Sequence, residues 1–417
     1  MSFQQGLSGL NTTSKSLEVI GNNIANANTF GAKSSRAEFS DMYAAALNGG
    51  GANQVGIGVT LAAVAQQFTQ GSITATENPM DLAINGGGFF QVSDASGGTA
   101  YSRNGQFKID QNGYIVNNSS QRLMGYMADN NGVIQPGAAT PLQLPTAGIE
   151  PAPTSQVGLE MNLDSREAVT PPQTPMIDFS DAATYAEATE MTVYDAKGQP
   201  VSVSYYFQKT ATDTWNVYAT ANGHSIGGTD ADPQPVNALT FAADGSTFTA
   251  SNTTLDIPAT TDANGVETLA ISGVDMGFSG STQYGSAFAV TNLDQDGYSA
   301  GSLRGITVDA TGIVMARYTN GQTKPAGQLQ LANFRNPQGL QPMGGNGWRL
   351  TYASGDPILG TAGSGAFGSL QAGALEESNV DLTGELVAMI TAQRNYQANA
   401  QTIKTMDQVM QTLVNLR

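Results

Sequence analysis

The feature that most constrains this chain is that its two ends are patterned as helices, whereas the sequence between them is patterned as β-structure. Alternating spacings of four and three predict a heptad seam over residues 378–417, and residues 1–30 repeat that spacing. The carboxyl-terminal seam consists of Leu382, Leu386, Met389, Gln393, Tyr396, Ala400, Ile403, Asp407, Met410 and Val414. The amino-terminal stripe consists of Leu7, Leu10, Ser14, Leu17, Gly21 and Ile24. We expect these stripes to bury against each other or against copies of themselves, which favours an assembly element over a catalyst.

The terminal helices are expected to be weak on their own. Gly6, Gly9 and Gly21 each cost about 1 kcal/mol relative to alanine in a helix, and Gln393 and Asp407 interrupt the apolar seam. A plain intramolecular core is the alternative interpretation of such stripes. Because marginal helices need packing partners, we expect these segments to become ordered on assembly.

Composition excludes several classes of protein. The 417 residues carry 17 basic and 34 acidic side chains, and this net charge of −17 disfavours binding to nucleic acid or to anionic membrane. There is no cysteine and a single histidine, His224, which excludes disulfides, thiol catalysis and multi-histidine metal sites. No apolar run approaches about 18 residues, so membrane insertion is not expected. The first residues lack a basic region followed by an apolar core, so we expect export without a cleaved signal peptide.

Turn signals divide the sequence between the ends into short strands. Asn-Gly pairs at residues 85–86, 112–113, 131–132, 320–321 and 346–347 predict hairpins. One strand–turn–strand unit occurs at residues 107–115 and again at 306–314, with a looser copy at 193–198. In each copy, an aspartate is expected to bond to the backbone of its own Asp-x-x-Gly turn, and the glycine is expected to supply a positive φ.

Proline indicates where the domains divide. Eight of the 17 prolines lie between residues 136 and 175, a stretch predicted to be an extended connector. Residues 201–207 and 215–219 then alternate as strands. The predicted fold is α+β, with terminal α-helices that pair as a coiled coil and two mainly antiparallel β domains nested between them. The predicted parts are a terminal helical assembly domain (1–30 plus 378–417), a connecting segment (31–70 plus 364–377), a discontinuous β domain (71–145 plus 286–363) and an inserted outer β domain (146–285).

Two short motifs suggest chemistry but are poor matches. Gly223-His224-Ser225-Ile226-Gly227 fits the Gly-x-Ser-x-Gly pattern of a hydrolase, yet the chain's one histidine is the serine's own neighbour. Asp294-Gln-Asp296-Gly297 is similar to the start of a calcium loop, but the later ligands are missing, and a tight turn is the better interpretation. No two carboxylates are singled out as a glycosidase pair. We therefore expect no catalytic, cofactor-binding or metal site.

Several segments resemble the bacterial flagellar rod and hook axial proteins over nearly the whole chain. Residues 20–29 (Ile-Gly-Asn-Asn-Ile-Ala-Asn-Ala-Asn-Thr) and residues 375–382 and 392–399 resemble the motifs shared by that family. Residues 280–286, 296–301 and 331–340, together with the long insert 146–285, resemble its hook branch more narrowly than its distal rod branch. Residues 29–33 depart slightly, because the family usually has an aromatic residue after the glycine. The motif residues are Asn22, Asn23, Asn26, Asn28, Ser378, Asn379, Val380 and Asp381.

The resemblance implies a structural subunit that is exported through the flagellar type III apparatus and polymerises into a flexible curved tube, a universal joint between motor and filament. It implies an extracellular location in the hook, with rod, hook cap and hook–filament junction proteins as partners. The residues expected to mediate subunit assembly are Leu7, Leu10, Leu17, Ile24, Leu382, Leu386, Met389, Tyr396, Ile403 and Met410. A distal rod-type axial protein, a secreted β-rich adhesin and a β-rich hydrolase remain the alternatives.

Overall fold

The computed structural model describes residues 2–43, 56–129, 132–145, 147–171, 174–250, 254–261 and 265–415. Its contacts divide the chain into two compact units. The first comprises Met1–Thr146, Gly305–Arg317 and Thr323–Arg417, and the second comprises Ala147–Arg304 and Tyr318–Gln322. The four-part division of the sequence stays a prediction. Asn131, the first residue of the Asn-Gly pair predicted at residues 131–132, lies outside the described residues.

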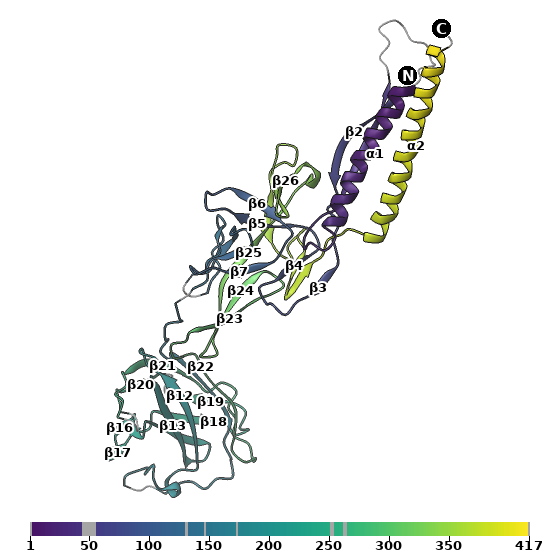
Figure 1. The fold of residues 1–417 in the computed structure, drawn as a ribbon. Coiled ribbons are helices and arrows are strands. Elements are labelled where there is room, and N and C mark those ends of the chain that lie inside the picture. The colour runs from purple at the N-terminus through teal and green to yellow at the C-terminus, as the bar shows by residue number, and fades with distance from the viewer. Residues whose placement is uncertain are drawn as a thin grey trace. The chain divides into compact units, whose positions relative to one another are not determined.

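The two ends of the chain form a helix pair in the first unit. α1 (Ser2–Ala25) and α2 (Leu382–Asn415) pack against each other, which confirms the predicted pairing of terminal helices (Figure 1). α1 runs without interruption through Gly6, Gly9 and Gly21 and ends at Ala25. β1 (Ser35–Tyr43) and β2 (Gly56–Gln66) form an antiparallel hairpin that also contacts α1.

A large sheet forms the β body of the first unit. Its main path is β23 (Leu303–Val308), β24 (Ile313–Tyr318), β25 (Thr323–Asn333), β9 (Arg122–Met127), β5 (Phe89–Ser93), β6 (Thr99–Ser102), β27 (Gly347–Arg349) and β26 (Gln341–Gly344). From β24 onward each pairing is antiparallel. The sheet also includes β7 (Phe107–Ile109), β8 (Ile115–Asn117), β10 (Thr140–Pro141) and β28 (Ile358–Thr361). Two short antiparallel pairs, β3 (Ile73–Ala75) with β30 (Ala374–Glu376) and β4 (Leu82–Asn85) with β29 (Ser369–Ala372), join sequence-distant segments.

Aromatic side chains hold the core of the β body together near the hairpin. Phe89, Tyr101, Phe334 and Trp348 are buried in one cluster, and Phe68, which follows β2, packs against it. Phe68 meets the rings of Phe89 and Trp348 edge to face, with centroids 5.6 and 5.4 Å apart. Edge-to-face pairs of this kind add about 0.5–1.5 kcal/mol beyond the area that they bury. The segment leaving the hairpin is therefore anchored in the β body.

The Asp-x-x-Gly turns form as predicted. In each of the three copies, one carboxylate oxygen of Asp110, Asp309 or Asp195 accepts bonds from the backbone N–H groups two and four residues later. The glycines that close these turns have φ values of 84° at Gly113, 83° at Gly312 and 74° at Gly198. These bonds satisfy backbone donors that the adjacent strands leave unpaired.

The hairpins predicted at the Asn-Gly pairs form at some of these pairs and not at others. Residues 112–113, 320–321 and 346–347 lie in or next to the turns of the antiparallel hairpins β7–β8, β24–β25 and β26–β27, as predicted. The prediction at residues 85–86 is wrong, because β4 pairs with β29 and not with the following strand β5. A local dipeptide signals a turn but does not report which distant strand supplies the pairing partner.

The second unit contains two sheets that share one core. One sheet runs β12 (Glu187–Tyr194), β13 (Pro200–Ala211), β14 (Thr214–Ala221), β18 (Asn237–Phe241) and β19 (Phe248–Ala250), with β15 (His224–Ser225) beside β14. The other runs β20 (Thr254–Ile257), β21 (Ile271–Gly277), β11 (Gln156–Asn162) and β22 (Ala289–Gln295), and its β11–β21 pairing is parallel. Smaller elements are β16 (Gly228–Thr229), β17 (Asp232–Pro233) and two 3₁₀ turns, Ala182–Thr184 here and Pro337–Gly339 in the first unit. Trp215, Tyr205 and Phe207 are fully buried between the sheets.

The two strands predicted at residues 201–207 and 215–219 are confirmed as β13 and β14, which pair antiparallel. The proline-rich stretch does more than connect, because β10 adds to the large sheet of the first unit and β11 adds to a sheet of the second.

Candidate functional site

The helix pair is antiparallel and closely packed at two glycines. A Cβ atom placed on Gly6 would lie 3.0 Å from Cγ1 of Ile403, and one placed on Gly9 would lie 2.9 Å from Nδ2 of Asn399. Since Gly6 faces Ile403 while Asn23 faces Glu385, the two helices run in opposite directions. The glycines that weaken α1 by propensity are thus the positions at which α2 approaches it.

The β1–β2 hairpin contacts α1 through backbone and small side chains. The side-chain amide of Gln5 donates to the carbonyl of Gly56 at 2.6 Å, and the N–H of Val59 donates to the Ser8 hydroxyl at 3.4 Å. Gly58 has a φ of 139°, and a Cβ there would collide with Ser8. α1 therefore contacts both the hairpin and α2. The side of α2 that faces away from α1 remains uncovered (Figure 1).

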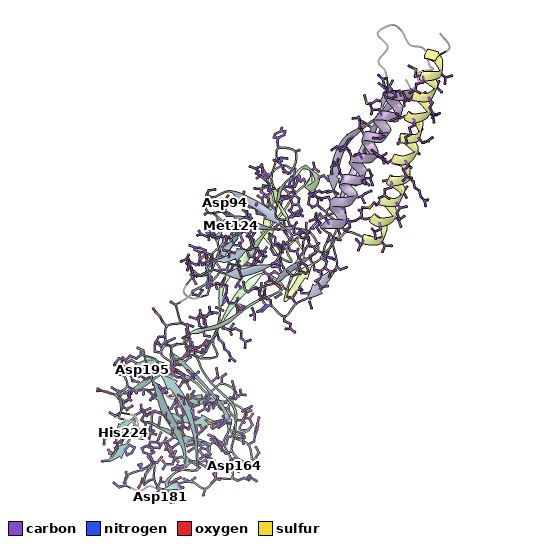
Figure 2. All side chains as sticks on the ribbon, in the orientation of Figure 1. Asp94, Met124, Asp164, Asp181, Asp195 and His224 are labelled. Atoms are coloured by element: carbon purple, nitrogen blue, oxygen red, sulfur yellow. The ribbon has the colours of Figure 1, made fainter. Side chains whose placement is uncertain are left out.

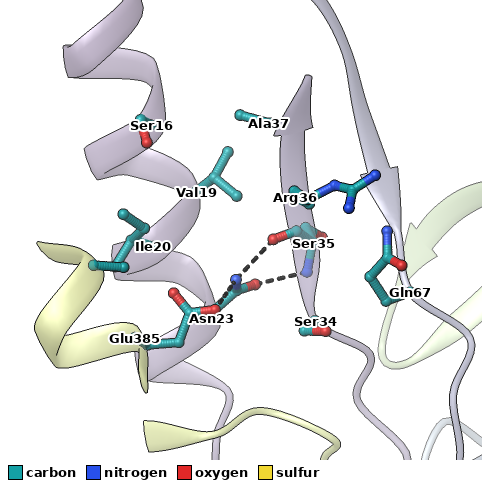
Figure 3. A pocket seen from close by; sticks show the side chains of 11 residues that line it. Ser16, Val19, Ile20, Asn23, Ser34, Ser35, Arg36, Ala37, Gln67 and Glu385 are labelled. Carbon is teal, nitrogen blue, oxygen red and sulfur yellow. Dashed lines mark hydrogen bonds between the residues drawn. The ribbon is translucent and has the colours of Figure 1, made fainter. Parts of the chain in front are cut away.

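Asn23 joins three elements at the base of the pair. Its Nδ2 donates to the carbonyl of Ser35 and to Oε1 of Glu385, each at 2.8 Å, and its Oδ1 accepts from the N–H of Ser35 at 2.8 Å (Figure 3). The side chain is almost completely buried. It stands beside a groove of about 360 Å³ between α1, α2 and β1, whose apolar wall includes Val19, Ile20 and Ala388.

A buried ion cluster lies where the helical ends meet the β body. The ammonium group of Lys33 contacts Oε1 of Glu376 at 2.6 Å, and Nη1 of Arg103 contacts Oε2 of the same carboxylate at 3.0 Å. Glu376 also accepts a bond from the N–H of Gly71. Burial lowers the pKa of Lys33 and of Arg103, and their contacts with Glu376 offset part of that lowering. One carboxylate therefore holds together four segments that are distant in sequence.

Asn379 completes this connection, which we call the junction and define as residues 31–34, 67–71, 103 and 376–379. Its Oδ1 accepts from the N–H of Ser34 at 2.7 Å, and its Nδ2 donates to the carbonyl of Gln67 at 2.8 Å. Lys33 donates in addition to the carbonyl of Thr69 at 2.7 Å. Neutral and charged bonds thus tie the segment that follows α1 and the segment that precedes α2 to the segment that leaves the hairpin.

The other motif residues stand at the helix ends. Oδ1 of Asp381 accepts from the N–H of Thr383 at 3.0 Å, as a residue that caps the start of α2 would. Asn26 bonds back to the carbonyl of Asn22, and the hydroxyl of Ser378 accepts from Val380. Asn22 and Asn28 are exposed. The structure therefore buries Asn23, leaves Asn379 partly buried with bonds to two other segments, and leaves Asn22, Asn28 and Asp381 exposed.

The residues predicted to mediate assembly divide into two groups. One group is exposed in the single chain and comprises Leu7, Leu382, Leu386, Tyr396 and Met410. The other is partly buried and comprises Leu10, Leu17, Ile24, Met389 and Ile403. Of these, Ile403 lies against Gly6 within the α1–α2 pair. Their role in binding other copies stays a prediction.

Sequence reasoning missed Lys33, Arg103 and Glu376 as partners, because no local pattern relates residues separated by 273 and 343 positions. It also missed Asn399 and Glu385 as contact residues of α2, since a search for apolar stripes gives polar residues no weight. The available signal was chemical, because Lys33 and Glu376 stand beside the two axial motifs at opposite ends of the chain.

The hydrolase-like motif does not have the geometry of a nucleophile and its base. The Ser225 hydroxyl donates to the carbonyl of Gly227 at 2.7 Å, whereas Nδ1 of His224 contacts Asp230 at 2.9 Å, and the imidazole and carboxylate are exposed (Figure 2).

The interpretation of residues 294–297 as a tight turn is wrong, because Asp294 lies within strand β22. The carboxylate of Asp296 accepts from the backbone of Ser155 and Gln156 and so secures the start of β11.

No helix in the described part of the chain combines the length and the hydropathy that a membrane span requires.

Four family models match successive parts of the chain. Residues 3–33 match the flagella basal body rod protein model, and residues 83–157 match the flagellar hook protein FlgE/F/G D1 domain. Residues 162–298 match the flagellar basal body protein FlaE D2 domain, and residues 371–416 match the flagellar basal body rod FlgEFG protein C-terminal model.

Full-length relatives match as well. The flagellar hook protein FlgE of Salmonella typhimurium is 42% identical over 420 residues, and the match covers 100% of both chains. The flagellar hook protein FlgE of Escherichia coli is 41% identical over 425 residues, also with complete coverage of both. That of Rhizobium meliloti is 35% identical and covers 100% of this chain and 98% of its own. End-to-end similarity of this degree shows that the chain belongs to the flagellar hook protein family.

Proposed function

We propose that this chain is the repeating subunit of a bacterial flagellar hook, which joins copies of itself into a flexible curved tube and transmits torque from the motor and rod to the filament. The observation that carries this proposal is the helix pair, in which the first and last segments of the chain meet and still expose apolar side chains such as Leu7, Leu386 and Met410. Exposed apolar faces on long helices are typical of surfaces that bind a partner.

Head-to-tail contacts between copies would extend this pair into a tube. A contact between two different surfaces of one chain closes into a ring only for particular rotations and otherwise yields an open helical polymer. The junction supports a mechanical role, because a buried carboxylate paired with two cations resists separation of the helices from the β body. Force applied to the terminal helices would therefore reach the β body through Glu376, Asn379 and the Phe68 contacts.

The wider setting follows from the same assignment. The tube would lie outside the cell in the hook of the flagellum, where rod, hook cap and hook–filament junction proteins would contact its two ends. The chain would be delivered by the flagellar type III export apparatus. Helices that are weak until they are packed suit a subunit that travels unfolded and becomes ordered on arrival.

The alternatives are not favoured. The relatives that match end to end are hook proteins, whereas the models that cover the two ends are described for rod proteins as well. A distal rod protein is therefore the less economical assignment. A monomeric adhesin or a hydrolase would not require the two chain ends to pair and to keep apolar side chains exposed.

Electron microscopy of the purified full-length chain, driven to assemble with a precipitating salt, tests the proposal. We expect tubes or short curved filaments from the unaltered chain and none from a chain that lacks residues 1–30 and 378–417. The substitution Ile403→Asp, which places a charge against Gly6, should also prevent assembly while the two β-rich parts remain protected from protease. Monomers alone, even with preformed hook fragments added as seeds, would contradict the proposal.

A further inference from the structure

The Asn-Gly pairs of this chain carry a chemical reactivity in addition to their role in turns. In such a pair, the backbone nitrogen of glycine can attack the side-chain carbonyl of asparagine, because glycine has no side chain to shield its nitrogen. Five pairs lie wholly within the described residues, at 85–86, 112–113, 222–223, 320–321 and 346–347. Because the dipeptide is the same in each pair, we expect differences in reactivity to follow from the hydrogen bonds that hold the asparagine side chain.

Four of the five asparagine side-chain amides are restrained by hydrogen bonds. The restrained residues are Asn85, Asn222, Asn320 and Asn346. Asn320 is held at both ends of its amide, since Nδ2 donates to the carbonyl of Ser299 at 2.6 Å and Oδ1 accepts from the N–H of Gln322 at 3.1 Å. Its side-chain carbonyl carbon can turn toward Gly321 only after both bonds break.

Asn112 differs from these four residues. Within the described part of the chain, only its backbone N–H and carbonyl are hydrogen-bonded, whereas its side-chain amide is free and the residue is exposed. The N–H of Gly113 donates to the carbonyl of Asp110 at 3.0 Å, as that of Gly321 does to Tyr318 at 3.2 Å, and the two glycines have φ values of 84° and 83°. The two attacking nitrogens are thus held alike, and the two pairs differ in the restraint on the asparagine side chain.

We propose that Asn112 is a site of spontaneous deamidation in the folded chain, with water as the co-reactant. The nitrogen of Gly113 gives up its proton and bonds to Cγ of Asn112, the Cγ–Nδ2 bond breaks, and the released nitrogen takes up a proton and leaves as ammonia. Water then opens the cyclic imide at one of its two carbonyls, which yields aspartate or isoaspartate. No group is oxidised or reduced, and the reaction does not depend on the proposed function.

The product would disturb a turn that several backbone bonds share. Oδ1 of Asp110 accepts from the N–H groups of Asn112 and Tyr114, and the carbonyl of Gly113 accepts from the N–H of Leu144. Isoaspartate inserts an extra carbon atom into the main chain before Gly113, and either product places a second carboxylate two residues from that of Asp110. Deamidation should therefore loosen the turn between β7 and β8 and its contact with Leu144.

Mass spectrometry of the purified full-length chain tests the inference. The chain is incubated at mildly alkaline pH and digested, and conversion to aspartate and isoaspartate is followed at each Asn-Gly pair. Asn112 should convert about tenfold faster than Asn320 or more, which corresponds to about 1.4 kcal/mol for the bonds that Asn320 must break. In denaturant, the five pairs should convert at similar rates.

Two results of this measurement would overturn the inference. One is a folded chain in which Asn320 or another of the five pairs converts as fast as Asn112. The other is a preference for Asn112 that persists unchanged in denaturant, because the local sequence would then account for it.

Removal of the restraint at a second pair gives an independent test. The exposed side chain of Gln70 donates to Oδ1 of Asn85 at 3.3 Å and accepts from the N–H of Gly86 at 3.0 Å. Gln70→Ala should therefore speed conversion at Asn85 by about tenfold and leave the rate at Asn112 unchanged. Gln234→Ala is the matched control, since Gln234 is an exposed glutamine of the second unit, and it should change neither rate. An unchanged rate at Asn85 in Gln70→Ala would show that amide hydrogen bonds do not set the reactivity.

Discussion

Nδ2 of Asn23 donates to Oε1 of Glu385 at 2.8 Å and so joins α1 to α2 across 362 positions of sequence. The same amide group bonds on its other side to the backbone of Ser35 at the start of β1. A buried asparagine inside a helix is costly unless its donors and acceptor are used. Here they are used to connect the helix pair with the hairpin.

Asn23→Ala should destabilise the helix pair because it leaves the Ser35 backbone and the Glu385 carboxylate without these partners. We expect a loss of about 1–3 kcal/mol, the cost of unsatisfied buried polar groups. Amide hydrogen exchange of Ser35 and of the first turns of α2 measures this loss of stability directly. Asn26→Ala is the matched control, since the side chain of Asn26 bonds to Asn22 within its own helix end, and exchange of the Ser35 and α2 amides should change little. Equal effects of the two substitutions would contradict a special role for Asn23.

Glu376→Gln should be more damaging, because it leaves the buried cations of Lys33 and Arg103 facing a neutral amide. Breaking a buried ion pair by removing one charge typically costs about 3–5 kcal/mol. Chemical unfolding followed through Trp348, which lies in the neighbouring aromatic core, reports this loss. Glu377→Gln, one residue later and partly exposed, should have a small effect. An unchanged unfolding midpoint for Glu376→Gln would show that the cluster is not needed for stability.

Periodicity predicted the terminal helices because heptad spacing is a local property of sequence. It did not predict all of the residues at which they touch. Gly6 and Gly9 have no side chains, so α2 comes close to them at Ile403 and at the polar residue Asn399. Apolar residues of the predicted seam such as Leu386 remain exposed. A pattern of apolar spacing indicates a surface that seeks a partner, but it does not specify which partner covers it.

The Asp-x-x-Gly turns were predictable in detail, because both the acceptor and the backbone donors lie within five residues. The ion cluster at Glu376 was not, because Lys33, Arg103 and Glu376 come from three distant segments, and the β3–β30 pairing that contains Glu376 is itself between distant segments. For the same reason, the Asn-Gly pair at residues 85–86 was assigned to a hairpin that does not form.

Glycine substitutions in α1 should have opposite outcomes according to what lies beside them. A Cβ at Gly21 meets no atom within 4 Å, so Gly21→Ala should stabilise α1 by about 1 kcal/mol through helix propensity. At Gly6 the added Cβ would press on Cγ1 of Ile403, so Gly6→Ala should lose that gain to crowding. Helix content of the full-length monomer by circular dichroism should rise for Gly21→Ala and stay level or fall for Gly6→Ala. A rise of the same size for both would mean that the close approach at Gly6 does not persist in solution.

Acid should weaken a contact at Asp164 in the second unit. Hydrogen bonds from the Arg166 side chain, followed by the Arg166 backbone N–H, lower the pKa of Asp164 to about 2. Since this pKa lies below the usual value of about 3.9, the contact contributes stability above pH 4 and loses it as pH falls toward 2. Carboxyl carbon NMR of aspartate-labelled chain should find a titration midpoint near 2. Arg166→Ala should move that midpoint upward toward the usual value; no movement would assign the low pKa to another cause.

Two aspartates in equivalent turns should differ in importance because their burial differs. The Asp195 side chain is fully buried, and it accepts from Lys197 and Gln199 in its own turn and, through Oδ2, from the N–H of Leu269. Asp309 makes the same turn bonds but is exposed, so water can replace its carboxylate. Asp195→Ala should therefore cost about 2–3 kcal/mol and Asp309→Ala about 1 kcal/mol or less.

Because the chain has two units, one global transition would mix their stabilities, and exchange rates of amides in β13 and in β24 should be compared separately. Faster exchange at Leu269 in Asp195→Ala would identify the bond that the exposed turn lacks, whereas equal losses in both variants would mean that the turn bonds alone account for the stability.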